Sequence, residues 1–423
     1  MKQLIVLCDG TGNSPETVTG AWSPTNVQIL KDILTRGTPR EQKKGYSNFS
    51  EGWSVEEFQT NSKKTLVHYD RGLGSPRLGN DGQLLKWSWQ PSSFFSNAQL
   101  VHSKFITTGE SVAAIGIIDN VAQAYRFLAQ NYEAGDEVFL FGFSRGAYTL
   151  RLLISIIRYI GLMKTEGLTE DEINKAIEKG FSLYNMQVHP EDNAAAKAFR
   201  DQGHPNNNLV KFLGLWDTVP GMVQEKVYDI SKLTSVVKTA RHAISIDEER
   251  KVFEPALWKD KTSVDSKQVW FSGVHCDIGG GYMERGLSNI ALQWMIKEAH
   301  NLGLNVDLAH LKAAEFNPDA LAMQHDSLNA RMKENFAFTW AHQGIHKRQV
   351  LQSDSSEKLH ESVLKRYGKT VPQEGKHISY KPSNLHMITP EMITPKISQR
   401  IEPEETSNTE KASSSPPRIK LRG

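Results

Sequence analysis

Short apolar runs alternate along the chain with longer stretches of helical periodicity. The apolar runs cover Gln3–Cys8, Leu66–Tyr69, Glu137–Phe143, Leu209–Trp216 and Gln268–Val274. They are apolar throughout rather than alternating, which is typical of strands buried on both faces of a parallel sheet. Apolar residues at helical spacing mark Ser111–Tyr132, Gly146–Ile160 and Leu287–His300. The alternation of strands and helices predicts an α/β fold with a doubly wound sheet.

Two segments interrupt this alternation. Thr38–Lys64 is polar and irregular, and we expect it to be an excursion from the sheet. Pro91–Lys104 is a second insertion, inside an aromatic segment that runs over Trp87–Phe105. This aromatic segment is either a partly buried loop or a lid that faces a substrate. From Glu402 onward the chain is rich in Pro, Ser and charge, which predicts a disordered tail.

The charge balance excludes one class of function. The 423 residues include 50 Lys and Arg and 48 Asp and Glu, a net charge of +2, so we expect no nucleic-acid partner. The two cysteines, Cys8 and Cys276, exclude a disulfide framework and fit a reducing compartment. The first nine residues lack the features of a signal peptide, and charged residues break the longest apolar stretch, Leu150–Leu162. These features predict a cytoplasmic protein without a transmembrane segment.

Gly142-Phe143-Ser144-Arg145-Gly146 is the most informative stretch of the sequence. Its Gly-x-Ser-x-Gly pattern lies between a predicted strand and a predicted helix, which is the context of a nucleophile elbow. In such a turn the two backbones come too close for a Cβ, so glycine is required on either side of the serine. We therefore expect Ser144 to be a nucleophile. The backbone N–H of Arg145, at the start of the helix, is then an oxyanion donor.

A nucleophilic serine needs a histidine as its general base and an acid that orients the histidine. His275 comes directly after a predicted strand and before a triple-glycine loop. Asp217 also follows a predicted strand, and it precedes the histidine in the chain, as the acid of an α/β-hydrolase does. Asp277 is the alternative acid, although it lies only two residues from His275 and more naturally caps the glycine-rich turn or binds a cation.

Two further polar clusters follow predicted strands or stand near the site. Asp9, Gly10 and Thr11 end the first strand, where small residues suit contact with a substrate and a second oxyanion donor from Thr11. A tight turn held by the Asp9 side chain explains the same residues equally well. In His242–Arg250 we expect a structural ion pair between Arg250 and a neighbouring carboxylate.

Five motifs in order make the sequence recognisable. The chain resembles the α/β-hydrolase family that includes the catalytic domain of type VI secretion phospholipase effectors, and the resemblance covers roughly its first 300 residues. The matching motifs are CDGTGN at 8–13, GFSRGA at 142–147, LWDTV at 215–219, HAISIDEER at 242–250 and GVHCDIGGGY at 273–282.

The resemblance implies an α/β-hydrolase-like fold with a mostly parallel central sheet, flanking helices and insertions. It also implies a serine esterase or lipase that acts on phospholipid acyl esters through an acyl-enzyme. Carried over by motif, GFSRGA supplies Ser144, LWDTV supplies Asp217 and GVHCDIGG supplies His275.

The composition along the chain and the resemblance together indicate the domains and partners that we expect. They are a catalytic domain over 1–345, a C-terminal extension over 346–400 that packs on or near it, and the disordered tail over 401–423. The expected partners are a lipid or other ester substrate and a membrane surface that the protein contacts peripherally. We expect no cofactor and no metal, and export would require a specialised secretion system.

Two hypotheses from other classes stay open at this point. Asp9, Asp217, His275 and Asp277 supply the oxygen and nitrogen ligands that a metal-assisted phosphoester hydrolase would need. That hypothesis leaves the Gly-x-Ser-x-Gly turn unexplained. A non-catalytic binding protein on a hydrolase scaffold is the second alternative, since fold does not determine function.

Overall fold

The computed structural model describes residues 1–10, 22–35, 53–60, 63–72, 77–78, 84–85, 112–184, 188–220, 230–259, 263–328, 346–351 and 357–385. Thr11, the aromatic segment Trp87–Phe105 and the predicted tail over 401–423 lie outside the described residues.

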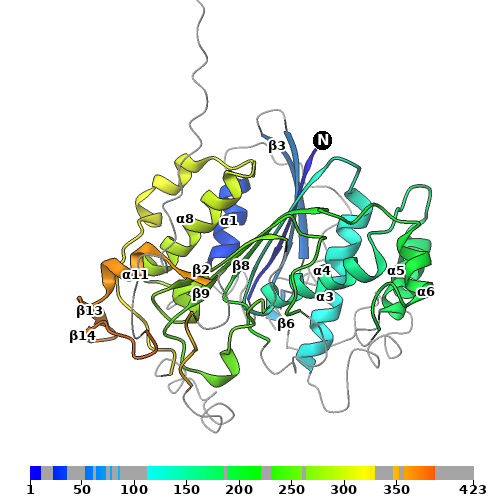
Figure 1. The fold of residues 1–423 in the computed structure, drawn as a ribbon. Coiled ribbons are helices and arrows are strands. Elements are labelled where there is room, and N and C mark those ends of the chain that lie inside the picture. The colour runs from blue at the N-terminus through cyan, green and yellow to red at the C-terminus, as the bar shows by residue number, and fades with distance from the viewer. Residues whose placement is uncertain are drawn as a thin grey trace, which may run out of the picture.

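An eight-stranded sheet forms the centre of the described molecule, in the order β12-β10-β9-β8-β7-β1-β4-β3 (Figure 1). Neighbouring strands are parallel, except that β3 pairs antiparallel with β4. The strands are β1 Gln3–Cys8, β3 Trp53–Thr60, β4 Lys63–Asp70, β7 Glu137–Phe143, β8 Val210–Trp216, β9 Thr239–Ser245, β10 Asp265–Phe271 and β12 Glu357–Leu359. The α/β-hydrolase-like fold class predicted from the sequence is confirmed.

Helices cover both faces of this sheet (Figure 1). On one side lie α3 Val112–Asn131, α4 Ser144–Ile160, α5 Glu170–Leu183 and α6 Ala194–Arg200, and on the other lie α1 Asn26–Thr35 and α8 Gly286–His300. In β1, Leu4 and Val6 pack with residues of α3 and α4, whereas Ile5 and Leu7 pack with residues of α1 and α8. Burial on both faces explains why this strand is apolar from Leu4 to Cys8.

Shorter elements complete the described fold. α7 His275–Gly279 and β11 Gly280–Tyr282 follow β10, and β11 pairs with β2 Trp22–Thr25. β5 Arg77–Leu78 pairs with β6 Leu84–Leu85, and single 3₁₀ turns cover Lys251–Phe253, Leu308–Lys312 and Ala314–Phe316. In the C-terminal part, β12 is followed by α11 Glu361–Arg366 and by the hairpin of β13 Thr370–Gln373 and β14 Lys376–Ser379. Because β12 pairs with β10, this part of the chain belongs to the central sheet.

The structure corrects the sequence-based elements in two places. The expectation that Thr38–Lys64 leaves the sheet is wrong for residues 53–60, which form the edge strand β3, and for Lys63 and Lys64, which begin β4. The sequence also gave no indication of β9, whose seven residues include Arg241 and His242 and are all buried. Strands β3 and β9 carry polar side chains that interrupt the apolar pattern on which the prediction depended.

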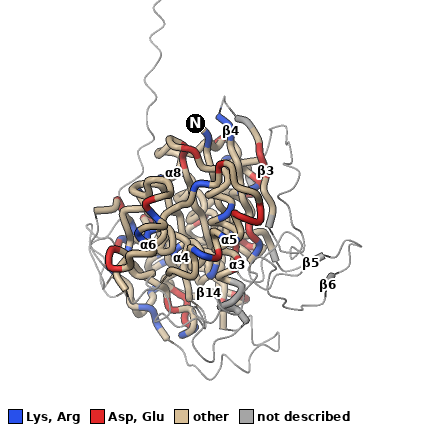
Figure 2. The backbone as a smooth tube through the Cα atoms, turned by 90° about the vertical axis from the view of Figure 1, so that its right-hand side faces the viewer, with Lys and Arg blue, Asp and Glu red and all other residues tan. Residues whose placement is uncertain are grey.

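Charged residues of both signs are interspersed along the described chain in the view of Figure 2, which agrees with the net charge of +2. Among the helices of the described residues, none combines the length and apolarity that crossing a membrane requires.

Candidate active site

Ser144 lies in the turn that joins β7 to α4. Its φ is 57°, in the left-handed region that non-glycine residues rarely adopt. A Cβ on Gly146 would lie 2.2 Å from the carbonyl oxygen of Cys8, and one on Gly142 would lie 2.8 Å from the backbone of Ala147. Both glycines are therefore required by the close approach of α4 to the ends of β1 and β7. The turn leaves Ser144 6% exposed, with Arg145 next to it in the first turn of α4.

Asp217 follows β8, the strand next to β7, and is fully buried. It too has a positive φ, of 40°, and its backbone N–H donates to Ala243 in β9 over 2.7 Å. One carboxylate oxygen, Oδ1, accepts a hydrogen bond of 2.9 Å from the backbone N–H of Ser245. The other, Oδ2, lies 2.5 Å from Nδ1 of His275.

His275 connects Asp217 with Ser144. It is the first residue of α7, four residues beyond the end of β10, and its Nε2 lies 2.9 Å from Oγ of Ser144. The imidazole is held between two aromatic rings, with ring centroids 4.7 Å away for Phe143 and 4.8 Å away for Phe253. The structure thus brings Ser144, His275 and Asp217 into one continuous hydrogen-bonded chain.

The electrostatics of this chain favour a neutral histidine beside a charged aspartate. Burial lowers the pKa of His275 below its ordinary value, although the hydrogen bond to Asp217 opposes this effect. Burial alone would raise the pKa of Asp217, but the charge of Arg348 and the hydrogen bond to His275 outweigh it, and the pKa falls well below the ordinary value. At neutral pH, His275 Nε2 is therefore free to accept a proton from the hydroxyl of Ser144.

Asp277, the alternative acid, bonds to a different histidine. Its Oδ1 lies 2.6 Å from Nδ1 of His325, and its Oδ2 accepts from the backbone N–H groups of Val274 over 3.0 Å and of His325 over 3.2 Å. The side chain therefore caps the first turn of α7 and ties it to the segment that contains His325. The ring of His325 in turn stacks on Tyr282, with centroids 3.8 Å apart.

The ion pair expected within His242–Arg250 is confirmed. Glu248 pairs with Arg250 through bonds of 2.7 Å from Nε and 2.8 Å from Nη2. The same carboxylate accepts from the backbone N–H of His275 over 3.3 Å, and the guanidinium of Arg250 lies over the Phe253 ring at 3.6 Å. Desolvation by itself would raise the pKa of Glu248, but its bonds to Arg250 lower the pKa to about 2. The ion pair therefore holds the backbone of His275 through Glu248 and contacts, through Arg250, the Phe253 ring that packs against the imidazole.

Asp9 lies at the end of β1 and is 3% exposed. Its carboxylate accepts from the backbone N–H of Gly10 over 2.7 Å, from Thr25 over 3.0 Å and from the hydroxyl of Tyr69 over 2.8 Å. Burial raises the pKa of Asp9 to about 7. The local bond to Gly10 is the kind of contact expected of a tight turn, while Thr11, the predicted second oxyanion donor, lies outside the described residues.

The four residues of the metal hypothesis are not gathered around one point. The carboxylate of Asp9 bonds to Tyr69, that of Asp277 to His325, and that of Asp217 to His275. In the part of the chain that the structure describes, no three His, Cys, Asp or Glu side chains form a group that suits a metal ion.

Sequence reasoning missed Arg348, which lies 131 residues after Asp217. Its Nη1 donates to Asp217 Oδ1 over 2.6 Å and its Nη2 to Oδ2 over 3.0 Å. The guanidinium also donates to the backbone carbonyls of Ser245 over 2.8 Å and Phe253 over 2.5 Å, and the residue is 1% exposed. No local motif surrounds it, so no signal in the sequence pointed to this contact.

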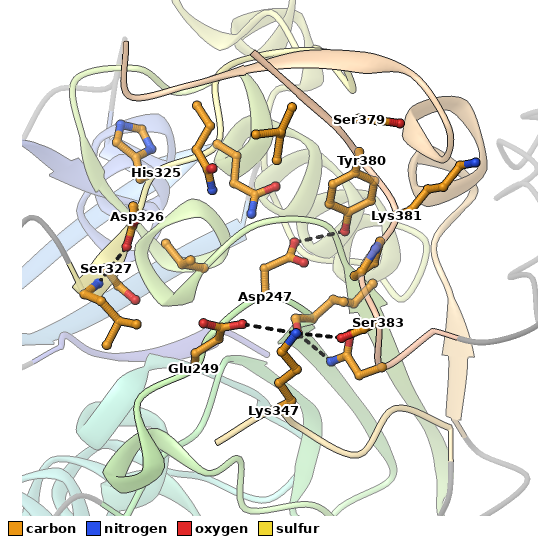
Figure 3. Close-up of a pocket in the computed structure, with 18 residues that line it drawn as sticks. Asp247, Glu249, His325, Asp326, Ser327, Lys347, Ser379, Tyr380, Lys381 and Ser383 are labelled. Atoms are coloured by element: carbon orange, nitrogen blue, oxygen red, sulfur yellow. Dashed lines mark hydrogen bonds and ion pairs between the residues drawn. The ribbon is translucent and has the colours of Figure 1, made fainter. Parts of the chain in front are cut away.

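A cavity of about 230 Å³ lies beside the site, between the segments that follow β9 and β10 and the C-terminal part of the chain (Figure 3). Val274 and Asp247 line it, whereas Ser144 and His275 do not. Asp247 accepts hydrogen bonds from the backbone N–H of Gly273 over 2.6 Å and from Tyr380 over 2.9 Å. The cavity is thus separate from the hydrogen-bonded chain of Ser144.

The mostly parallel sheet and the Ser–His–Asp arrangement at the carboxyl ends of its strands define an α/β-hydrolase-like protein. The model of the type VI secretion phospholipase effector Tle1-like catalytic domain matches residues 2–298. The chain belongs to this family, as the resemblance of its motifs predicted.

Individual relatives are more distant. Uncharacterized protein YEL023C of Saccharomyces cerevisiae is 28% identical over 260 residues, which are 60% of this chain and 32% of that protein. The chain therefore spans about a third of the length of this curated relative.

Two solved structures are also similar. An uncharacterized protein from Pseudomonas aeruginosa has a TM-score of 0.42 and 18% identity, covering 75% of this chain and 49% of the other. The Tle1 effector bound to the VgrG spike of the type VI secretion system has a TM-score of 0.34 and 16% identity, covering 67% of this chain and 51% of the other.

Proposed function

We propose that the protein is a serine carboxylic-ester hydrolase with lipolytic activity, in which Ser144, His275 and Asp217 form the catalytic triad. The observation that carries the proposal is the continuous hydrogen-bonded chain, with 2.9 Å from Ser144 Oγ to His275 Nε2 and 2.5 Å from His275 Nδ1 to Asp217 Oδ2. These are the contacts by which a base activates a serine hydroxyl and an acid orients the base.

In the proposed mechanism, Ser144 Oγ attacks the carbonyl carbon of the ester while His275 Nε2 accepts its proton. The carboxylate of Asp217 stabilises the imidazolium that forms. His275 then gives the proton to the departing alcohol, and the acyl group stays on Ser144. A water molecule, activated by the same histidine, releases the acid. The strained turn of Ser144 is the nucleophile elbow of this mechanism, and the Arg145 N–H is our choice for an oxyanion donor.

Membership in the family supports a proposal for the substrate class. A domain of the phospholipase effector family matches 2–298, so we propose phospholipid acyl esters as substrates and peripheral contact with a membrane surface as the mode of access. A cytoplasmic location before export through a specialised secretion system is part of the same proposal.

Labelling with a fluorophosphonate probe tests the mechanism, because such probes react with an activated serine. We expect the wild type to be labelled equally with and without EDTA, and mass spectrometry to find the adduct on Ser144. Hydrolysis of dioleoyl phosphatidylcholine vesicles and of p-nitrophenyl butyrate should fall by about 10⁴-fold or more in Ser144→Ala.

Ser155→Ala is the matched control, because Ser155 lies on the same helix and bonds to Tyr184 over 3.0 Å. It should keep its labelling and activity. Activity in Ser144→Ala above a few per cent of wild type would contradict the proposal. Activity that EDTA abolishes and a divalent cation restores would favour the metal-assisted phosphoester hydrolase instead. A folded wild type without labelling or hydrolysis would favour the binding protein.

A further inference from the structure

Arg348 gives the Asp217 carboxylate a partner from outside the region that matches the family. The family match ends at residue 298, and Arg348 comes 50 residues later, in the C-terminal part of the chain that also contributes β12 to the sheet. Its two Nη groups bond to the two carboxylate oxygens of Asp217, over 2.6 and 3.0 Å, in the end-on, bidentate geometry that suits guanidinium and carboxylate.

The remaining contacts of Arg348 hold the guanidinium in place. Nη1 also donates to the carbonyl of Ser245, at the end of β9, and Nη2 to the carbonyl of Phe253, whose ring packs against His275. Asp217 thus receives four donors, namely two from Arg348, one from the backbone of Ser245 and one from His275. These contacts leave the carboxylate little freedom to rotate away from the imidazole.

We propose that Arg348 is a positioning residue for the triad, which fixes the orientation of the Asp217 carboxylate and offsets part of its negative charge at His275. The C-terminal part of the chain is, on this proposal, needed to complete the active site. This inference rests on the proposed function for its kinetic consequences, but its effect on His275 is measurable without any substrate.

The charges around His275 set the expected sign. The carboxylate of Asp217 faces Nδ1 of His275, and that of Glu248 faces its backbone N–H. The guanidinium of Arg250 lies on the ring of Phe253, and that of Arg348 bonds to Asp217. Glu248 and Arg250 form their own ion pair, which a change at Arg348 leaves intact. Removing the positive charge of Arg348 makes protonation of the Asp217–His275 pair easier, whichever member takes the proton. The midpoint of the pair therefore moves to higher pH.

The test compares Arg348→Gln, Arg348→Lys and a matched control, Arg366→Gln. Arg366 is fully buried in the same C-terminal part and donates to the carbonyls of Ala320 and Ala322, each over 2.8 Å, but has no bond to Asp217. Two quantities are measured: kcat and kcat/KM for p-nitrophenyl butyrate against pH, and the pH titration of the His275 ring in ¹⁵N-histidine-labelled protein without substrate. His275→Gln identifies the His275 signals by their loss.

We expect Arg348→Gln to lower kcat by roughly 10- to 100-fold with little change in KM, since misplacement of a catalytic group by about 1 Å has this effect. In this variant, the midpoint of the acidic limb of the kcat/KM profile and the midpoint of the His275 titration should both move up by about one pH unit. Arg348→Lys should restore the midpoint of the His275 titration because it keeps the charge. Its kcat should remain about 10-fold below that of the wild type, because a single ammonium does not reproduce the paired bonds. Arg366→Gln should leave kcat and the midpoint at wild-type values.

An Arg348→Gln protein with an unmoved His275 midpoint would overturn the proposal even if its activity fell, because the residue would then be only structural. A shift of the same size in Arg366→Gln would overturn it as well. If Arg348→Gln does not fold, Arg348→Lys decides, since wild-type kcat in that variant would contradict positioning by the paired bonds. A wild type that hydrolyses no ester would refute the proposed function alone, while the titration would still give its answer for Arg348.

Discussion

Replacing Asp217 with asparagine changes the charge and hydrogen-bonding of one buried group while keeping its shape. The carboxylate accepts from Ser245 and Arg348 on Oδ1 and from Arg348 and His275 on Oδ2. An amide NH₂ must replace one of these oxygens and then faces donors. At the Oδ1 position both donors are fixed, because neither a backbone N–H nor a guanidinium gives up its proton. At the Oδ2 position only one of the two donors, Arg348, is fixed, because His275 can respond by moving its proton to Nε2.

The amide nitrogen should therefore settle at the Oδ2 position, with His275 in the tautomer that donates to Ser144. A histidine in that tautomer cannot accept the proton of the serine, and the corresponding change in a Ser-His-Asp protease lowers the rate by about 10⁴-fold. That loss equals about 5 kcal/mol of transition-state stabilisation. The variant also leaves the buried Arg348 without its counter-charge, which should lower the free energy of unfolding by about 3 kcal/mol.

The assay is kcat/KM for p-nitrophenyl butyrate at pH 8, with urea unfolding on the same samples. Asp277→Asn is the control, because it alters an equally buried carboxylate in the same part of the site. It should lose about 1–3 kcal/mol of stability through weaker bonds to Val274 and His325, yet keep its rate within about tenfold. Asp217→Asn within tenfold of wild type would refute the reasoning, and a reversed order of damage would move the triad acid to Asp277.

Three further predictions follow from the same geometry. Because burial lowers the pKa of His275 from 6.5, and the base must be neutral, kcat/KM should rise with pH along a limb whose midpoint lies below 6.5; a midpoint above 7 would contradict this. Gly146→Ala would place a Cβ 2.2 Å from the Cys8 carbonyl and should cost about 3 kcal/mol or more in urea unfolding, whereas Gly180→Ala, which meets only side-chain atoms at 2.9 Å and beyond, should cost less. Burial raises the pKa of Asp9 to about 7, so the folded state holds a proton that the unfolded state loses near pH 4; stability should fall as pH rises from about 4 to 7, by up to about 4 kcal/mol. Asp9→Asn should remove that part of the pH dependence, and an unchanged slope would show that another group causes it.

The parts of the fold that the sequence predicted are those where local pattern and tertiary environment agree. β1 and β7 have the bounds expected, Gln3–Cys8 and Glu137–Phe143, because both strands are buried on two faces and are apolar after their first residue. Strand β9 was not predicted, because it contains buried polar residues whose partners lie far away in the sequence. Arg241 pairs with Glu298 of α8, and His242 accepts from the backbone N–H of Thr218 over 3.0 Å. Its polarity is satisfied by tertiary contacts, which a local pattern does not reveal.

The same distinction applies to the site. Ser144, Asp217 and His275 each follow a strand that the sequence predicted, so the parallel order of the sheet was enough to place all three at one edge. The choice between Asp217 and Asp277 depends on which of the two carboxylates faces the imidazole of His275. The backbone geometry after β8 and in α7 decides this, and the sequence does not reveal it. The φ of 40° at Asp217 and the cap that Asp277 forms on α7 are both consequences of packing.

Arg348 shows why the electrostatics of the site needed the structure. A buried carboxylate that must stay charged requires a compensating charge, and its position in the chain is free as long as the fold returns it to the same place. In this protein, Arg348 lies shortly before β12 in the chain, and β12 is the edge strand opposite β3. The three residues of the proposed triad follow strand ends, and one of them stands within a glycine pattern. Arg348, whose charge lowers the pKa of Asp217, is placed only by the three-dimensional path of the chain. Motifs therefore point to the groups that we propose to react, whereas the charges that shift the pKa of His275 are evident only from the tertiary structure.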